Sequence, residues 1–321
     1  MGILQVHFSG GEPCLRKDLE ELTAGARELD LYINLITSGV PLSHERLEKL
    51  AELGLNHVQL SLQDSDEETA NLIAHYPDSY RRKLAVAKAV RACGLPLTLN
   101  APVHRMNIDH LEGTIDLAVE MDAERMEVAH VQYYGWAYHN RAALMPHRRQ
   151  LEWATEVVER ARERLRGQLV IDYVVPDYYA RRPKACMGGW ARQFLNVTPS
   201  GKVLPCHAAE SITSLAFDNV RERPLKEIWL HSEAFERFRG TDWMPEKCRS
   251  CPRHEIDWAG CRCQAFAITG DAASMDPACE HSDHHEELVN IANLEAQTGQ
   301  SKFDYRRINF VKDPASAAVP T

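Results

Sequence analysis

Seven of the nine cysteines in the chain fall between residues 186 and 279, and their spacing is typical of metal ligands. Cys248-x2-Cys251 and Cys261-x-Cys263 are close pairs, and one tight turn can direct both thiolates of such a pair at one centre. With one carboxylate from the same segment the candidate ligands number eight: Cys186, Cys206, Cys248, Cys251, Asp257, Cys261, Cys263 and Cys279. Eight ligands suit two four-coordinate centres, which are zinc sites or iron–sulfur clusters.

Spacing alone does not decide between zinc and iron–sulfur, because both use sets of thiolates. Buried, inert thiols are the alternative for any cysteine, and we expect that role for Cys14 and Cys93. The histidines at 281, 284 and 285 could also bind metal, but a solvated helix start explains them better.

A second motif, Ser9-Gly10-Gly11-Glu12-Pro13, follows an apolar strand-like run at residues 3–8. In parallel α/β folds the carboxyl ends of the strands form the ligand-binding edge, and paired glycines there let a ligand approach the backbone. Glu12 could accept hydrogen bonds from a ligand ammonium group. Alternatively, the motif is only a tight turn with Glu12 at a helix start. Small polar residues at other strand ends, such as Ser61 and Asn100, favour a polar ligand such as a nucleoside.

Strand-like and helix-like segments alternate through the first half of the chain. Apolar strand candidates lie near residues 3–8, 31–36, 57–62, 96–101 and 125–131, with another at 168–174. Helices are expected after Ser43, over 80–93, after Asp109 and over 147–166, with another at 285–296. This order predicts a parallel sheet, either open or closed into a barrel, and five units plus one preceding them would make a six-unit partial barrel.

The pattern changes after Pro176, where turns multiply and the cysteines begin. We therefore predict an α/β domain over 1–179, a turn-rich metal-binding domain over 180–300 and a tail over 301–321. Because the sequence opens directly inside a strand-like run, we expect it to begin in the middle of a domain.

Composition excludes several classes of protein. The 321 residues are 44% hydrophobic and carry 37 basic against 46 acidic residues, a net charge of −9, so nucleic-acid binding is not expected. No apolar run is long enough to span a bilayer, and we expect no membrane partner. An odd number of clustered cysteines without a secretory signal indicates a cytoplasmic protein that binds metal rather than one that forms disulfides.

Together these motifs resemble the radical S-adenosylmethionine (SAM) enzymes that carry a C-terminal SPASM domain. That family has Cys, then G-x4-C, then C-x2-C-x5-C-x3-C and a last Cys. Gly201 and six of the cysteines match it in order and spacing, whereas Asp257 replaces one expected Cys and Cys263 is additional. The resemblance extends to about residue 285 and implies a partial (β/α)6 TIM-like barrel, missing its first unit, followed by an iron–sulfur SPASM domain.

The resemblance also implies roles for individual residues. Gly10, Gly11 and Glu12 would hold the methionyl amino group of SAM, and Ser61 and Asn100 would lie near its ribose. Two auxiliary clusters, [4Fe–4S] or [2Fe–2S], would be bound in the SPASM domain. One would use Cys248, Cys251, Asp257 and Cys279, and the other Cys186, Cys206 and Cys261, with Cys263 as the fourth ligand.

One element of the family is not found in these 321 residues. Radical SAM enzymes carry a C-x3-C-x2-C loop ahead of Gly-Gly-Glu-Pro, and this loop holds the [4Fe–4S] cluster that cleaves SAM. We therefore expect the SAM-binding cluster site to be absent from the sequence as given, through truncation of its start.

Asp257 and the segment Tyr133-Tyr134-Gly135-Trp136-Ala137 are similar to the branch of the family that acts in pyrroloquinoline quinone (PQQ) biosynthesis. This branch implies a radical oxidoreductase that joins a glutamate to a tyrosine of the precursor peptide PqqA by a C–C bond. The peptide chaperone PqqD and an external electron donor would be its partners. The alternatives are another SPASM peptide-modifying enzyme, or a non-catalytic zinc or electron-transfer module.

Overall fold

A six-stranded parallel sheet forms the first of two units in the computed structural model, which describes residues 1–132, 135–297 and 304–305. This unit comprises Met1–Val131 and Leu144–Val175. The strands are hydrogen-bonded in chain order: β1 Gln5–Phe8, β2 Tyr32–Thr37, β3 His57–Ser61, β4 Leu97–Val103, β5 Arg125–His130 and β6 Val170–Val174. Every strand-like run of the sequence is a strand. The run at 168–174, which is not among the five strand–helix units predicted from the sequence, forms the sixth strand, β6.

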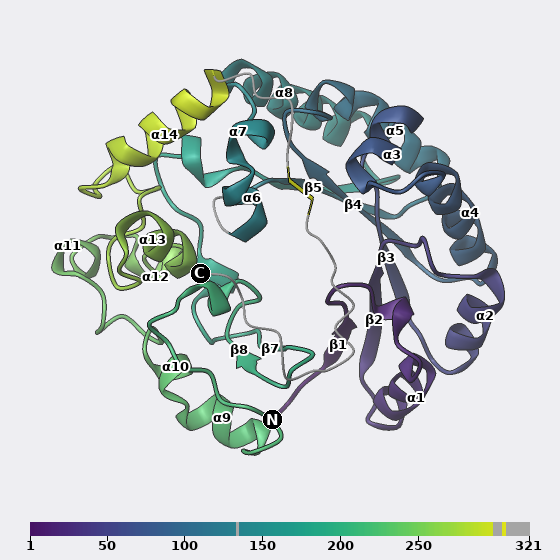
Figure 1. Cartoon of the computed structure of the whole chain (residues 1–321), viewed down its shortest axis with the longest axis horizontal. Helices are drawn as coiled ribbons and strands as arrows, with labels where there is room; N and C mark the ends of the chain where they lie inside the picture. The colour runs from purple at the N-terminus through teal and green to yellow at the C-terminus, as the bar shows by residue number, and fades with distance from the viewer. Residues whose placement is uncertain (133–134, 298–303, 306–321) are drawn as a thin grey trace. The chain divides into compact units, whose positions relative to one another are not determined.

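Helices cover the outer side of this curved sheet (Figure 1). They are α1 Leu19–Glu28, α2 His44–Glu52, α3 Glu67–Ala74, α4 Ser79–Ala92, α5 Leu111–Glu120 and α8 Arg148–Arg164, with short 3-10 turns at Pro13–Leu15 and Ile108–His110. Ser43 caps α2 as predicted, its hydroxyl accepting from the Arg46 N–H at 3.2 Å. The cap predicted at Asp109 is wrong: a 3-10 turn intervenes, α5 begins at Leu111, and Asp109 accepts hydrogen bonds from Gln150 instead.

The two faces of the sheet differ in polarity because side chains alternate along each strand. The face toward the helices is apolar, with Ile33, Val58, Leu97 and Met126 fully buried. Each such side chain contributes about 1.5–3 kcal/mol to folding. The opposite face is polar, and its side chains bond across strands, as His7 does with Asn34 at 3.2 Å. This polar face leads to the strand ends where the sequence places ligand-binding residues.

The second unit comprises Gln132–Ala143 and the chain from Pro176 onward. It has one antiparallel pair, β7 Asn196–Val197 with β8 Val203–Leu204, and 3-10 turns at Asp177–Tyr179, Cys186–Gly188 and Ala209–Ser211. Its helices are short except the last: α6 Gly135–His139, α7 Arg141–Leu144 (whose final residue belongs to the first unit), α9 Leu225–His231, α10 Glu233–Glu236, α11 Glu246–Arg249, α12 His254–Asp257, α13 Arg262–Thr269 and α14 His285–Gln297. The expected turn-rich part after the α/β part is confirmed.

Some predictions fall partly outside the described residues. Tyr133 and Tyr134 do, and so does the tail predicted over 301–321, apart from Asp304 and Tyr305. None of the described helices has both the length and the apolar composition that crossing a bilayer requires.

Candidate functional site

The Gly-Gly-Glu-Pro segment leaves β1 as an open turn. Gly10 has φ +119°, which favours glycine, and both Gly10 and Gly11 are exposed. A Cβ on either glycine would have no other atom of the chain within 4 Å. The backbone there is therefore accessible to a ligand, as expected for a surface that a substrate approaches closely.

Glu12 is more constrained than the sequence indicates. Its Oε1 accepts from Cys14 N at 3.0 Å and from Thr37 Oγ1 at 2.7 Å, and its Oε2 accepts from Ser38 N at 2.8 Å and Ser38 Oγ at 2.5 Å. Burial raises the pKa of Glu12, but these hydrogen bonds outweigh it and hold the pKa below its ordinary value. The carboxylate is thus kept ionised, and it ties the ends of β1 and β2 together.

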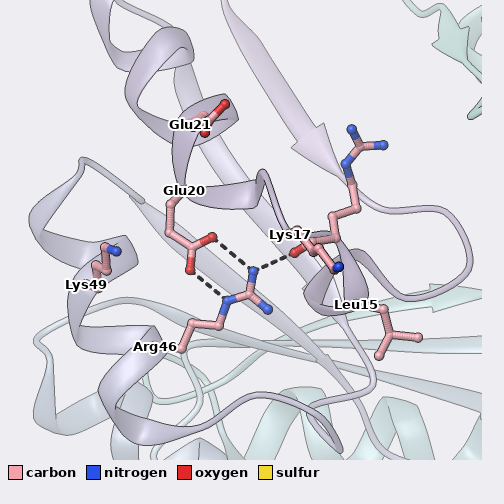
Figure 2. A pocket seen from close by; sticks show the side chains of 7 residues that line it. Leu15, Lys17, Glu20, Glu21, Arg46 and Lys49 are labelled. Atoms are coloured by element: carbon pink, nitrogen blue, oxygen red, sulfur yellow. Dashed lines mark hydrogen bonds and ion pairs between the residues drawn. The ribbon is translucent and has the colours of Figure 1, made fainter.

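A surface pocket of about 500 Å³ lies beside the residues that follow Glu12 (Figure 2). Its lining is mostly charged: Leu15, Arg16, Lys17, Glu20, Glu21, Arg46 and Lys49. Arg46 forms a two-point ion pair with Glu20 and also donates to the carbonyls of Cys14 and Arg16. Arg46 therefore stabilises the turn after Glu12, and we interpret the residues around the pocket as support for that turn rather than as a ligand-binding site.

Ser61 and Asn100, the residues predicted to lie near a ribose, are neighbours in the sheet. They are paired in the register of β3 and β4, at the end of β3. Asn100 Nδ2 donates to Glu127 Oε2 at 2.7 Å, and Gln59 Nε2 reaches the same oxygen at 3.4 Å. Glu127 of β5 is therefore an acidic group of this polar face that sequence reasoning missed.

Lys83 is a second residue that the sequence did not single out. It belongs to α4, is only 2% exposed, and donates to Gln63 Oε1. Burial lowers its pKa to about 8, while the nearby Glu12 carboxylate acts in the opposite direction. The sequence around Lys83 does not indicate this burial, because lysines in amphipathic helices are usually solvated.

Four cysteines of the second unit come together as one group, which we call the Cys261 set: Cys186, Cys206, Cys261 and Cys263. The thiols of Cys186 and Cys263 each hydrogen-bond to both Cys206 and Cys261. These bonds lower the pKa of Cys206 and Cys261 and raise the pKa of the two donors. The four sulfur atoms are therefore close enough to interact directly with one another.

Local structure explains this grouping. Gly201 has φ +91° and a Cβ on it would lie 2.4 Å from Asn219 Oδ1, so only glycine fits the turn that leads through β8 to Cys206. Cys261 caps the N-terminus of α13, where the helix dipole favours thiolate, and Cys263 lies in the first turn of the same helix.

The other four predicted ligands form a second group, which we call the Cys248 set: Cys248, Cys251, Asp257 and Cys279. Burial raises the pKa of Cys248 to about 11, and the charges of the other three members act on it as well. Asp257 is buried and accepts from Arg253 Nε and the Ala259 N–H, each at 3.2 Å, while Arg182 donates to Cys279 Sγ at 3.8 Å.

The donor chemistry of both sets fits iron–sulfur clusters. None of the nine cysteines is in a disulfide, and within the described residues no three His, Cys, Asp or Glu side chains converge as they would around a single metal ion. Cys14 and Cys93 lie apart, in the first unit. Cys14 is 3% exposed and burial raises its pKa to about 12, as expected for an inert thiol. His284 pairs with Glu287, and His285 contacts the carbonyl of Pro277.

Comparison with known proteins agrees with both motifs. Residues 1–118 match the radical SAM superfamily, and residues 186–252 match an iron–sulfur cluster-binding domain, SPASM. A protein of Xanthomonas campestris pv. campestris (strain 8004), named PqqA peptide cyclase, is 60% identical over 307 residues, which are 96% of this chain and 82% of that protein. The chain belongs to the PqqA peptide cyclase family. The cyclase of Bradyrhizobium diazoefficiens is 58% identical over 95% of this chain and 81% of its own length.

Solved structures support the fold of this PqqA peptide cyclase family member. SuiB of Streptococcus suis bound to S-adenosylmethionine aligns with TM-score 0.69 and 19% identity, over 86% of this chain and 66% of SuiB. Native anSMEcpe with bound AdoMet and Cp18Cys peptide aligns with TM-score 0.63 and 18% identity, over 92% of this chain and 87% of that one. The predicted family and fold class, a partial barrel followed by a SPASM domain, are confirmed.

Proposed function

We propose that the protein is a radical SAM peptide cyclase that joins a glutamate side chain to a tyrosine ring of PqqA by a C–C bond during PQQ biosynthesis. The observation that carries this proposal is 60% identity to a PqqA peptide cyclase over 96% of the chain, in a chain whose eight expected cluster ligands fall into two groups. The bond forms with net loss of two hydrogen atoms from the peptide.

The first unit would bind SAM at the edge where its strands end. Gly10, Gly11 and Glu12 would hold the methionyl amino group, since the two glycines are open and the carboxylate is kept ionised. Ser61 and Asn100 would face the ribose from adjacent strands. When bound together with its cluster, SAM supplies the radical that removes hydrogen from the peptide. The first unit has only two cysteines, Cys14 and Cys93. We therefore propose that the cysteines of these 321 residues do not provide the [4Fe–4S] site for that step.

The second unit would hold two auxiliary clusters, one in the Cys261 set and one in the Cys248 set, each of [4Fe–4S] or [2Fe–2S] type. Thiolates are the preferred ligands of such clusters, and both sets are mostly cysteine. Restoring the aromatic ring of the tyrosine releases a proton and an electron, and the auxiliary clusters would accept the electron.

Three partners complete the proposal: PqqA as substrate, PqqD as its peptide chaperone, and an external electron donor, all in the cytoplasm. SuiB has been solved bound to the precursor peptide SuiA, so the fold accommodates a precursor peptide in that protein.

The proposal is tested with protein that also carries a C-x3-C-x2-C segment, incubated without air with SAM, reductant, PqqA and PqqD. We expect PqqA to lose the mass of two hydrogens and to contain a Glu–Tyr crosslink in tandem mass spectra. A thioether or a decarboxylated product would identify another SPASM peptide-modifying enzyme. Unmodified peptide with a colourless, zinc-containing protein would identify a non-catalytic module.

Replacing Glu12 by Ala in the same protein is expected to weaken SAM binding about ten- to a hundredfold. A charge-assisted hydrogen bond contributes about 1.5–3 kcal/mol, which corresponds to that change in Kd. Calorimetric titration with SAM measures it, and Glu28→Ala, which removes an exposed carboxylate of α1 outside the pocket, is the matched control. Iron content should stay at the parent value. Equal SAM affinity in Glu12→Ala and the parent would remove Glu12 from the site.

Replacing Asp257 should change only the Cys248 set. A carboxylate donates less electron density to iron than a thiolate, and ligand identity is one determinant of cluster potential. Asp257→Cys is expected to keep a cluster with an altered spectrum and potential, and Asp257→Ala to leave an open or substituted iron site. Electron paramagnetic resonance (EPR) of the reduced variants is the measurement, with the exposed neighbour variant Glu255→Ala as control. Parent spectra from both Asp257 variants would mean that Asp257 is not a ligand.

A further inference from the structure

Arg262 is a charged side chain buried in the middle of the metal-binding unit. It is 1% exposed and belongs to the first turn of α13, between Cys261 and Cys263. Its guanidinium donates to the carbonyls of Ala272 at 2.8 Å and Ser274 at 2.7 Å, and also to that of Ala259. The ring of Trp243 lies 4.9 Å from its Cζ. A buried arginine is costly unless it is paired, so its surroundings must compensate the charge.

Cysteines of both sets interact with the charge of Arg262. They are Cys186 and Cys261 of the Cys261 set, and Cys248 of the Cys248 set. The geometry agrees, because Ala259 accepts a hydrogen bond from Arg262 and donates its own N–H to Asp257 of the Cys248 set. The carboxylate that faces it is Asp276, whose Oδ2 accepts from the Cys261 N–H at 2.5 Å and whose Oδ1 accepts from Gln264 Nε2 at 2.8 Å. Arg262 is therefore a cation shared by the two groups of ligands.

Close packing keeps this arrangement fixed. A Cβ on Gly260, which has φ +78°, would lie 2.2 Å from Asp276 Oδ2. Only glycine at this position lets the carboxylate approach the backbone between Asp257 and Cys261. The guanidinium is held at the same time by carbonyls on either side, so the charge stays in one place when an electron arrives.

We propose that Arg262 is a positioning residue for electron transfer, a fixed positive charge that raises the reduction potentials of the clusters in both cysteine sets together. The physical reason is that reduction adds negative charge to a cluster, and a nearby cation in a site of low dielectric constant stabilises the reduced form. An electron released in the reaction would then enter either set more easily. The inference rests on the proposed cluster ligation and adds to it a determinant of potential that is not a ligand.

Arg262 could instead serve only to hold three backbone carbonyls, and Arg239 offers a matched control for that role. Arg239 also donates to backbone carbonyls, of Ala191 at 3.2 Å and Trp229 at 2.7 Å, and stacks on Trp229 with 5.3 Å from Cζ to the ring centroid. Its ion-pair partner is Glu236 rather than a cysteine. Loss of Arg239 therefore removes a similar backbone contact without removing the shared charge.

The test is a redox titration followed by EPR on the anaerobically reconstituted chain, with iron and acid-labile sulfide measured first. Arg262→Gln is expected to shift both midpoint potentials in the negative direction, by about tenfold in each reduction equilibrium, which is 59 mV for one electron. Arg262→Lys should keep both potentials near those of the parent, and Arg239→Gln should leave them unchanged even where it lowers the unfolding temperature.

Each outcome is decisive. Arg262→Gln with full iron and parent potentials, or an equal shift in Arg239→Gln, overturns the proposal. If Arg262→Gln retains no iron, the Arg262→Lys variant distinguishes the two roles. Clusters retained at parent potentials in Arg262→Lys support the role of the positive charge. Loss of the clusters from Arg262→Lys would give Arg262 a purely structural role. A parent protein that holds no iron would instead refute the proposed clusters, which the metal analysis distinguishes.

Discussion

A polypeptide of these 321 residues, reconstituted with iron and sulfide without air, is expected to hold clusters and yet to release no 5′-deoxyadenosine from SAM. A cluster that cleaves SAM requires three thiolates close to the Gly-Gly-Glu-Pro segment. The first unit has only Cys14 and Cys93. Burial raises the pKa of Cys14 to about 12, and Cys93 follows α4 as its C-terminal cap. Two thiols are fewer than the three that such a cluster requires.

Chromatography of the reaction after addition of dithionite and SAM measures this. The same residues preceded by a C-x3-C-x2-C segment serve as the positive control and should produce 5′-deoxyadenosine. Product above the no-enzyme level from the 321-residue polypeptide would show that other side chains hold a SAM-cleaving cluster.

Separate loss of the two clusters is the second large effect that we expect. Cys206→Ala should remove the cluster of the Cys261 set and Cys251→Ala that of the Cys248 set, each with about one third to two thirds of the bound iron, depending on the types of the two clusters. The reason is that the two groups have no ligand in common, so each can form without the other. Iron analysis together with EPR of each variant is the measurement.

Cys93→Ala is the matched control, because it removes a half-buried thiol of the first unit that is distant in sequence from both sets. It should keep all of the iron. Complete loss of iron from either Cys206→Ala or Cys251→Ala would mean that the two sets do not assemble independently, and loss from Cys93→Ala would contradict the assignment of ligands.

The sequence was sufficient for the β/α part because its signals are local. Alternating apolar residues mark each strand, and Ser43 marks the start of α2 through a side-chain bond to a backbone N–H three residues away. The cap at Asp109 failed for a similar local reason. A 3-10 turn at Ile108–His110 delays α5, and Gln150, 41 residues later, binds that carboxylate.

The candidate site shows where local signals end. Spacing identified the cysteines, and the family pattern divided them into the two groups that the structure brings together. It could not identify Lys83, Glu127 or Arg262, whose roles depend on long-range burial. Lys83 is covered by the fold around α4, and Glu127 becomes a partner of Asn100 only through the register of β4 and β5. The sequence of an amphipathic segment does not indicate which of its charged residues become buried or bind a distant partner.

We propose that both cysteine sets of this PqqA peptide cyclase family member bind iron–sulfur clusters. Metal and acid-labile sulfide analysis of the anaerobically purified chain, combined with Mössbauer spectroscopy, tests it most directly. We expect a brown protein with iron and sulfide in amounts that fill two clusters, and with Mössbauer signals from both. A colourless protein with zinc bound to the same cysteines and no sulfide would contradict it.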